Sequence, residues 1–482
     1  MNPSQFQFSM ILNELSAIVG HDHVVIPEAD RTIYGVDVYW VPRMLIDRGQ
    51  LPPLSDVIVQ PGTVEEVVAV VKLAGLYHLP VIPWGGGSGS QGGIMPVYGG
   101  LMVDLKRLNK IIWINEMAGT VTAQAGINGF DLEIALNEAG WTLPHYPASV
   151  HSATLGGYLA CRGSGTISTK YGKAEDMVLA MEVVLPNGDV IRTLPVPNHA
   201  AGPGILQLFV GAEGSFGIIT EATMRLERLP EVRRFRSFLF PDLHAGLEAG
   251  RNIMLDRLQP LVIRLYDERS TIKTVKHVLG TEVDHGSYMV IGFDGYEDVA
   301  AAQAQHAYQI CEKFGGQDLG EEPGQHWWEH RYDFYFPPKT LEFPWMFGTL
   351  DTVTTFDKIE NLYWAKKNTL EERYKSWGLY YYAHFSHWYD WGVMAYDRFV
   401  IEKPPQDAGE ALALHDEIWD LAVKTNLDYG GVINEHHGVG LKLARHVRTQ
   451  YGAAFQVLDD LKDTLDPYHL FNPGKMGFGP PR

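Results

Sequence analysis

The sequence has few cysteines, no excess of positive charge and no long apolar run. Its two cysteines, Cys161 and Cys311, form no Cys-x-x-Cys pair. Neither a disulfide framework nor a thiolate metal site is therefore supported, and we expect a reducing compartment. The formal net charge of −19 argues against a nucleic-acid partner, because phosphates require a basic footprint. No window reaches about 18 consecutive apolar residues, so we expect no integral membrane contact.

The two ends of the sequence carry no targeting signal that we can identify. The first eight residues lack the basic start and apolar run of a signal peptide, and the last four differ from a peroxisomal signal. We therefore expect a cytoplasmic protein. A hydrophobic content of 45% is ordinary for a globular chain, and 482 residues suffice for two or three domains of roughly 100–200 residues.

Glycine, by contrast, is abundant and gathered in one stretch. Residues 79–82 predict a strand, and residues 83–93 follow it with a Gly-x-Gly-x-x-Gly match at 87–92. A Rossmann site would need a helix directly after these glycines. Residues 94–105 instead predict a turn and a second strand. We therefore reject the Rossmann interpretation and predict a loop whose backbone N–H groups bind a pyrophosphate.

Hydrophobic patterns divide the chain into two regimes. Up to about residue 225, short elements alternate with glycine-rich segments, and residues 147–165 are predicted to form a long loop of small residues. After Pro230, strands and helices alternate without such loops and lead into aromatic stretches, which indicates a separate sheet with helices on one side. Predicted strands cover residues 56–59, 111–125, 183–191 (a hairpin), 218–223, 235–240, 261–266 and 289–293; predicted helices cover 9–19, 63–74, 128–139, 206–209, 245–258, 299–314 and 408–425.

Five motifs in this order resemble the FAD-linked oxidoreductases of the vanillyl-alcohol-oxidase/para-cresol-methylhydroxylase superfamily. They are the glycine loop at 83–93, Ser-Ala-Thr-Leu-Gly-Gly at 152–157, Gly-Ala-Glu-Gly-Ser-Phe-Gly-Ile-Ile-Thr at 211–220, His-His-Gly-Val-Gly at 436–440 and Phe-Asn-Pro-Gly-Lys at 471–475. The resemblance implies an α+β fold, with a two-subdomain FAD-binding domain at 1–228 and a cap domain with an antiparallel sheet at 229–445. It also implies that residues 446–482 return to the FAD domain, and that the protein is a homodimer.

Within the superfamily, the alkyldihydroxyacetonephosphate synthase-like members share further matches at residues 263–267, 388–396 and 436–437. The superfamily often attaches its flavin to a histidine of the glycine loop, and residues 79–108 contain none, so we expect non-covalent FAD. By this resemblance the FAD-binding residues are Trp84, Gly85, Gly86, Gly87, Ser88, Gly89, Ser90, Pro147, Ser149, Ser152, Thr154, Gly156, Gly157, Arg162, Ser164, Glu213, Gly217 and Ile219.

The same resemblance assigns the chemistry to Tyr396, His436, His437, His384 and Arg264. A neutral imidazole accepts a proton near pH 7, and a phenol can relay one. His384 stands where the synthase-like members have an arginine, which argues against a phosphate-bearing substrate. The surrounding aromatic residues indicate an apolar or aromatic substrate.

A metal is the alternative use of these histidines. His384 and His387 could ligate an ion together with His437, but the metal-dependent relatives have a glutamate where this chain has His436. We therefore expect no metal.

Three functions remain open. We favour an FAD-dependent oxidase or dehydrogenase, in which flavin N5 takes a hydride from a C–H next to a hydroxyl of an alcohol, a 2-hydroxy acid or a para-phenolic side chain. The first alternative is a synthase-like exchange of an acyl for an alkoxy group through a flavin adduct. The second is a non-catalytic flavin-binding protein.

Overall fold

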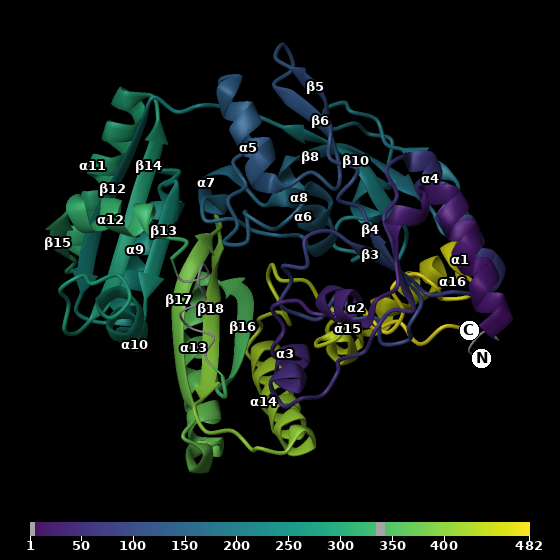
Figure 1. The fold of residues 1–482 in the computed structure, drawn as a ribbon. Helices are drawn as coiled ribbons and strands as arrows, with labels where there is room; N and C mark the ends of the chain where they lie inside the picture. Colours follow the sequence, from purple (N-terminus) through teal and green to yellow (C-terminus); the bar gives the residue numbers. More distant parts are fainter. Residues whose placement is uncertain (1–4, 334–342) are drawn as a thin grey trace.

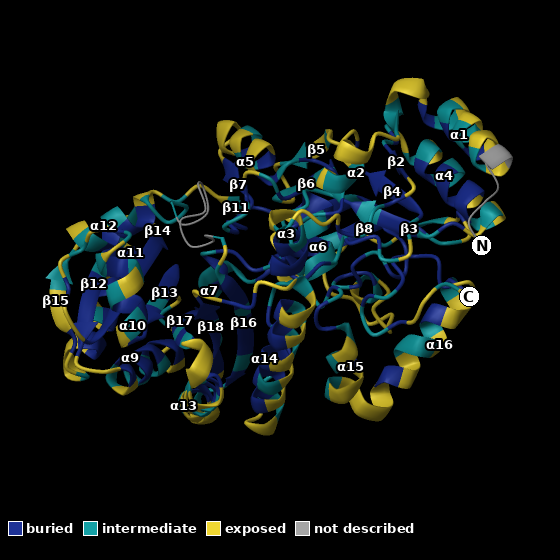
Figure 2. Ribbon diagram, turned by 60° about the horizontal axis from the view of Figure 1, so that its bottom comes forward, coloured by how far each residue is buried: buried dark blue, intermediate teal, exposed yellow. Residues whose placement is uncertain are grey.

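The computed structural model describes residues 5–333 and 343–482. In these residues the main strands form a four-stranded, a five-stranded and a seven-stranded sheet. Figure 1 shows the seven-stranded sheet with its helices on one side of the molecule and the two smaller sheets on the other. In Figure 2 the buried positions lie along the sheets, and the exposed ones lie on the outer helices such as α1, α5 and α16. Within this part of the chain, no helix is long and apolar enough to cross a membrane.

The four-stranded sheet positions the glycine loop. Its strands are β1 (Val24–Val25), β2 (Val57–Val59), β4 (Leu101–Asp104) and β3 (Val81–Trp84), in the order β1-β2-β4-β3. Helix α1 (Gln5–Val19) packs against α4 (Val64–Tyr77), which begins at Thr63, whose side chain accepts a hydrogen bond from the Glu66 N–H. The glycine loop leaves β3 and is followed by β4, which runs parallel to β3. This strand confirms the rejection of the Rossmann interpretation.

The five-stranded sheet is antiparallel and positions the next segment. It consists of β5 (Ile111–Asn115), β6 (Thr120–Gln124), β10 (Ile218–Arg225), β8 (Val178–Val184) and β9 (Val190–Arg192), in the order β5-β6-β10-β8-β9. Helix α5 (Gly129–Glu138) begins at its capping residue Asn128, one residue inside the predicted start.

The prediction of one long loop over residues 147–165 was wrong. Residues Leu155–Cys161 form helix α6, and the side chain of Thr154 caps it by accepting the Gly157 N–H. A Cβ atom at Gly156 would lie 2.9 Å from the Ala125 Cβ. The small residues therefore allow a helix to pack closely on its neighbour, whereas the sequence pattern was interpreted as backbone freedom.

The seven-stranded sheet forms the other half of the molecule, and its strand pairs are antiparallel. The predicted strands at 235–240, 261–266 and 289–293 are present, but the aromatic stretches hid three more, at 346–355, 380–388 and 392–401. The strand order is β15 (Gln317–Gly320), β12 (Val232–Phe240), β14 (Ser287–Gly295), β13 (Val262–Tyr266), β17 (Tyr380–Trp388), β18 (Gly392–Ile401) and β16 (Met346–Thr355). The main helices that accompany it are α9 (Leu243–Leu255), α11 (Glu297–Lys313), α12 (Glu322–Glu329), α13 (Phe356–Arg373) and α14 (Ala408–Asp428).

The C-terminal segment returns to the first half of the molecule. Helices α15 (Ala444–Tyr451) and α16 (Phe455–Leu465) lie near the N-terminal helices in Figure 1. Phe471 forms a bridge with Val81, and the Asn472 side chain donates hydrogen bonds to the carbonyls of Gly93 and Glu213. The tail therefore supports the glycine loop from behind, while the domain limits at 228 and 445 stay predictions.

Candidate functional site

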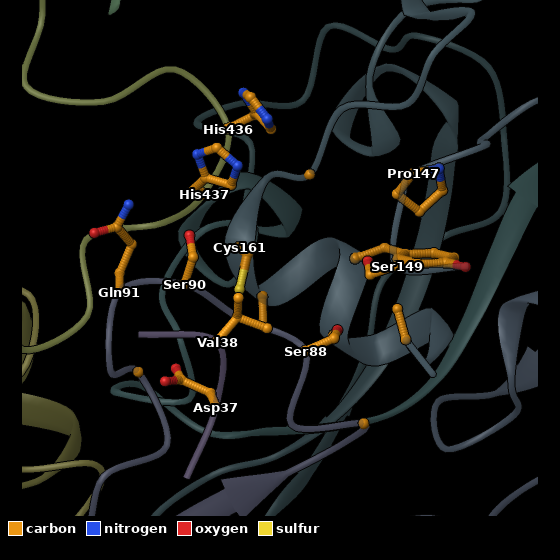
Figure 3. Close-up of a pocket in the computed structure, with 18 of the residues that line it drawn as sticks. Asp37, Val38, Ser88, Ser90, Gln91, Pro147, Ser149, Cys161, His436 and His437 are labelled. Carbon is orange, nitrogen blue, oxygen red and sulfur yellow. The ribbon is translucent and has the colours of Figure 1, made fainter. Parts of the chain in front are cut away.

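A cavity of about 550 Å³ lies between the two halves of the molecule. One wall consists of the glycine loop after β3, the start of α6 and residues 213–219. The opposite wall consists of strands of the seven-stranded sheet and the histidine loop, residues 434–437. Figure 3 shows side chains from both walls, with His436 and His437 on one side and Ser88, Pro147 and Ser149 on another.

The glycine-loop wall is made largely of backbone. A Cβ atom at Gly86 would lie 1.8 Å from the Ser152 carbonyl oxygen, and one at Gly85 would lie 2.4 Å from the Thr154 Oγ1. Only glycine lets the loop approach the start of α6 so closely, and the exposed peptide groups form a cradle for an anionic group. Among the described residues, the buried Trp84 Nε1 and Ser90 Oγ have no hydrogen-bond partner and are available to a ligand. This wall fits a dinucleotide such as FAD.

The predicted FAD-binding residues gather in this cavity with one exception. Arg162 does not line it, because the Arg162 side chain is 51% exposed and pairs with Glu175. The lining residues are Trp84, Gly85, Gly86, Gly87, Ser88, Gly89, Ser90, Pro147, Ser149, Ser152, Thr154, Gly156, Gly157, Ser164, Glu213, Gly217 and Ile219.

Two buried carboxylates of the glycine-loop wall were not expected to be perturbed. Asp37 accepts hydrogen bonds from the N–H groups of Tyr39 and Gly92, and burial raises the pKa of Asp37 to about 7. Glu213 accepts hydrogen bonds from the N–H groups of Val439 and Gly440, and burial raises the pKa of Glu213 to about 7 as well. Asp37 lies in an N-terminal segment without any motif, so no sequence signal identified it.

The opposite wall contains a cluster of histidines held by carboxylates. His437 Nδ1 lies 2.7 Å from Asp351 Oδ1. His436 Nδ1 lies 2.6 Å from Glu435 Oε2, although the two groups are not aligned for a straight hydrogen bond. Burial lowers the pKa of His436 to about 4, with a further contribution from His437, so His436 is neutral at pH 7. Both histidines line the cavity and are available as proton acceptors.

The register of the sheet brings the other predicted catalytic residues to the same region. His384 on β17 pairs with Tyr396 on β18, and their rings stack at 4.6 Å. Tyr396 and Arg264 line the cavity, whereas His384 lies behind Tyr396 and does not. Burial lowers the pKa of His384 well below its usual range, and Arg264 adds to this effect, so His384 is neutral.

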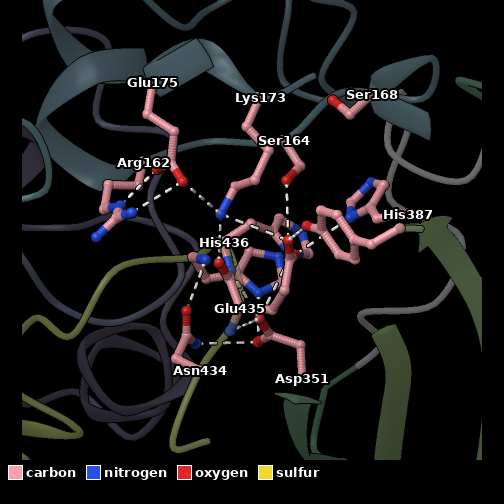
Figure 4. Close-up of polar contacts among 12 residues, drawn as sticks. Arg162, Ser164, Ser168, Lys173, Glu175, Asp351, His387, Asn434, Glu435 and His436 are labelled. Carbon is pink, nitrogen blue, oxygen red and sulfur yellow. Dashed lines mark hydrogen bonds and ion pairs between the residues drawn. The ribbon is translucent and has the colours of Figure 1, made fainter. Parts of the chain in front are cut away.

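The sequence analysis missed the carboxylates of this cluster. Ligand-type atoms of Asp351, His436 and His437 lie within 4.8 Å of one another, as do those of His387, Glu435 and His436, which is a spacing that could hold a metal ion. Lys173 Nζ, however, lies 3.4 Å from Glu435 Oε1 and neutralises its charge (Figure 4). The carboxylates therefore serve their neighbours in this structure, and the expectation that no metal is bound stays a prediction.

Comparisons with known proteins decide the family. The model of the C-terminal domain of FAD-linked oxidases matches residues 229–476, and an FAD-binding domain model matches residues 55–194. The chain belongs to the FAD-linked oxidoreductases of the vanillyl-alcohol-oxidase/para-cresol-methylhydroxylase superfamily. Its cofactor is FAD. The fold class and the superfamily predicted from the sequence are thereby confirmed.

Individual relatives of this family member have different activities. It is 32% identical to an alkyldihydroxyacetonephosphate synthase of Dictyostelium discoideum, over 89% of this chain and 74% of that protein. It is 26% identical to a mitochondrial D-lactate dehydrogenase (cytochrome) of Arabidopsis thaliana, over 88% of this chain and 73% of that protein. A solved alkyldihydroxyacetonephosphate synthase superposes with a TM-score of 0.81 at 28% identity, covering 98% of this chain and 86% of the other. Para-cresol methylhydroxylase gives a TM-score of 0.78 at 18% identity, covering 99% and 98%, which shows the shared fold.

Proposed function

We propose that this FAD-linked oxidoreductase is an oxidase or dehydrogenase that removes hydrogen from a carbon bearing a hydroxyl group. The observation that carries the proposal is the neutral His436, beside His437 and Tyr396, on the cavity wall that faces the glycine loop. Bound FAD supplies the acceptor for the two electrons of the C–H bond. The chain itself must then bind the substrate and take the hydroxyl proton.

The proton chemistry follows from the charges of the cluster. When His436 accepts the substrate's O–H proton, the imidazole becomes imidazolium, and the electron pair of the O–H bond stays on oxygen. Tyr396 lies 5.7 Å from His436 between ring centroids and 5.3 Å from His437, so its hydroxyl is placed to contact the substrate oxygen. Arg264 adds a positive charge to the same wall and favours a substrate with an anionic or oxygen-rich end.

A synthase-like exchange is the second candidate, because the chain is 32% identical to a named alkyldihydroxyacetonephosphate synthase. Arg264, Tyr396 and the histidine pair match that branch, and in this reaction the flavin would show no net reduction. The cavity wall does not decide between the two candidates.

An anaerobic visible spectrum separates the candidates. We expect the flavin absorption to bleach when a suitable alcohol, 2-hydroxy acid or para-substituted phenol is added, and we expect His436→Asn to slow bleaching by about 10²–10⁴-fold while FAD stays bound. His306→Asn, which changes an exposed histidine paired with Asp256, is the matched control and should bleach at the native rate. A flavin that no such substrate bleaches, together with ether formation from an acyl-dihydroxyacetone phosphate and a fatty alcohol, would replace the proposal by the synthase reaction.

We further propose that FAD is held without a covalent bond by the seventeen predicted residues that line the cavity, that residues 1–228 and 446–482 form the FAD domain, and that the cap spans residues 229–445. The return of the tail to Val81 and Gly93 supports this division. We also propose a cytoplasmic homodimer.

A further inference from the structure

Glu435 is a buried acid that neither the sequence motifs nor the proposed reaction uses. Its side chain is 1% exposed, does not line the cavity and lies between the two halves of the molecule. On the FAD side it meets Lys173 and Ser164, and on the cap side it meets His387, His436 and Tyr389 (Figure 4). So many polar contacts around one carboxylate indicate a fixed position and a fixed charge.

Lys173 keeps this carboxylate ionised. Its ammonium lies 3.4 Å from Glu435 Oε1 and donates a hydrogen bond of 2.7 Å to the Glu435 carbonyl oxygen. Burial alone would raise the pKa of Glu435, but Lys173 and then His387 outweigh burial and hold it well below its usual range. An ionised carboxylate has acceptors only, so any hydrogen shared with a neighbouring imidazole must come from the imidazole.

Asp351 has a different duty in the same cluster. It accepts hydrogen bonds from the backbone N–H groups of Glu435 and His436, from Asn434 Nδ2 and from His437 Nδ1. Four donors occupy this carboxylate, and they hold the histidine loop in place. Its nearest oxygen is 3.4 Å from His436 Nδ1, compared with 2.6 Å for Glu435 Oε2. Glu435 is therefore the main acceptor that His436 Nδ1 faces.

We propose that Glu435 is a positioning residue for His436: it keeps the hydrogen on Nδ1, so that Nε2 is left with its lone pair for the substrate proton, and it stabilises the imidazolium that forms. This inference rests on the proposed function for its chemistry, but the tautomer can be measured without a substrate. The logic is that of a carboxylate that orients a catalytic histidine, in which a wrong tautomer removes most of the rate. The charged and titratable groups around the pair are Lys173, Asp351, Tyr389, His387, Tyr396, His437 and His145.

The first test reads the tautomer of His436 in FAD-loaded protein by ¹⁵N NMR of labelled imidazoles, with His436→Gln used to assign its signals. We expect Nδ1–H in the native protein. In Glu435→Gln the amide can donate to Nδ1, and we expect a shift to Nε2–H. Native protein with Nε2–H, or an unchanged tautomer in Glu435→Gln, would overturn the proposal. Because no substrate is added, failure of the proposed function leaves this result intact.

The second test reads the rate of flavin reduction once a substrate is known. Glu435→Gln should slow it by about 10²-fold or more without weakening substrate binding, because Glu435 does not line the cavity. Glu435→Asp, which keeps the charge, should recover part of the rate. Glu175→Gln is the matched control: Glu175 faces Lys173 at 3.9 Å but contacts none of the histidines. An equal loss in Glu175→Gln would reduce Glu435 to a structural role and overturn the proposal.

Two further measurements keep the result interpretable. Glu435→Gln leaves the Lys173 ammonium buried without its carboxylate, which can destabilise the fold. The double variant Lys173→Met/Glu435→Gln removes both charges and should fold while showing the same tautomer and the same slow reduction. A native rate in the folded double variant would contradict the proposal. Metal analysis of the purified protein should find no bound divalent ion, and one equivalent per chain would replace the hydrogen-bond assignment by a metal site.

Discussion

The two walls of the cavity are built from different parts of the amino acid. The glycine-loop wall presents backbone, and its shape depends on the absence of side chains at Gly85 and Gly86. The opposite wall presents imidazole and phenol groups, and its properties depend on charges behind them, such as Glu435 and Asp351. The difference suggests that the first wall holds a constant ligand, the cofactor, while the second carries the chemistry of one substrate class.

Gly86→Ala is expected to have the largest effect on the backbone wall. The new Cβ would lie 1.8 Å from the Ser152 carbonyl oxygen, and neither backbone can yield without moving the loop or the start of α6. Overpacking of this kind costs about 1–3 kcal/mol or more, so FAD affinity should fall by at least about tenfold. Flavin content after dialysis and a titration of the apoprotein with FAD measure the change.

Gly75→Ala is the matched control for this substitution. Gly75 lies in α4, and a Cβ there meets nothing within 4 Å. FAD affinity should be unchanged, and the helix should gain slightly in stability, because alanine has the higher helix propensity. If both variants bound FAD like the native protein, the glycine loop would not be the cofactor wall, and the contrast between the two walls would disappear.

The contrast also explains which parts could be predicted from the sequence. The glycine loop is a local pattern, so its turn and the strand after it followed from the residues at 83–105. The histidine pair was visible as a motif, but Asp351 is 85 residues away from His436 and reaches it through β16, a strand that the sequence analysis missed. Glu435 stands beside the pair in the sequence, yet its importance depends on Lys173 in the other half. Sheet register and contacts between domains leave no local signal.

Asp37 places an ionisable group in the backbone wall and gives that wall a pH dependence. Burial raises the pKa of Asp37 to about 7 from an ordinary 3.8, against the opposing effects of two backbone N–H groups and Lys442. The folded state therefore binds this proton more tightly than the unfolded state. The stabilisation is complete below about pH 4 and is lost as the pH rises through about 7, by up to about 4 kcal/mol.

Asp37→Asn should remove this part of the slope in the apoprotein. Asparagine keeps an oxygen acceptor for the Gly92 N–H but does not titrate. Urea unfolding between pH 5 and pH 8 should show a smaller loss of stability with rising pH in the variant than in the native apoprotein, with the remaining slope from groups such as Glu213. Parallel curves for the two proteins would mean that Asp37 does not hold a proton near neutral pH.

Arg162→Ala is expected to have the smallest effect, although the family resemblance assigned Arg162 to the cofactor. Arg162 is half exposed and pairs with Glu175 outside the cavity, and surface ion pairs contribute about 0–1 kcal/mol. FAD affinity should change less than about twofold. Thr154→Ala is the comparison, because Thr154 lines the cavity and caps α6, and losing the cap alone costs about 1 kcal/mol. If Arg162→Ala weakened FAD binding more than Thr154→Ala, a charged side chain would contribute more to the cofactor wall than its backbone, and the distinction between the two walls would fail on the cofactor side.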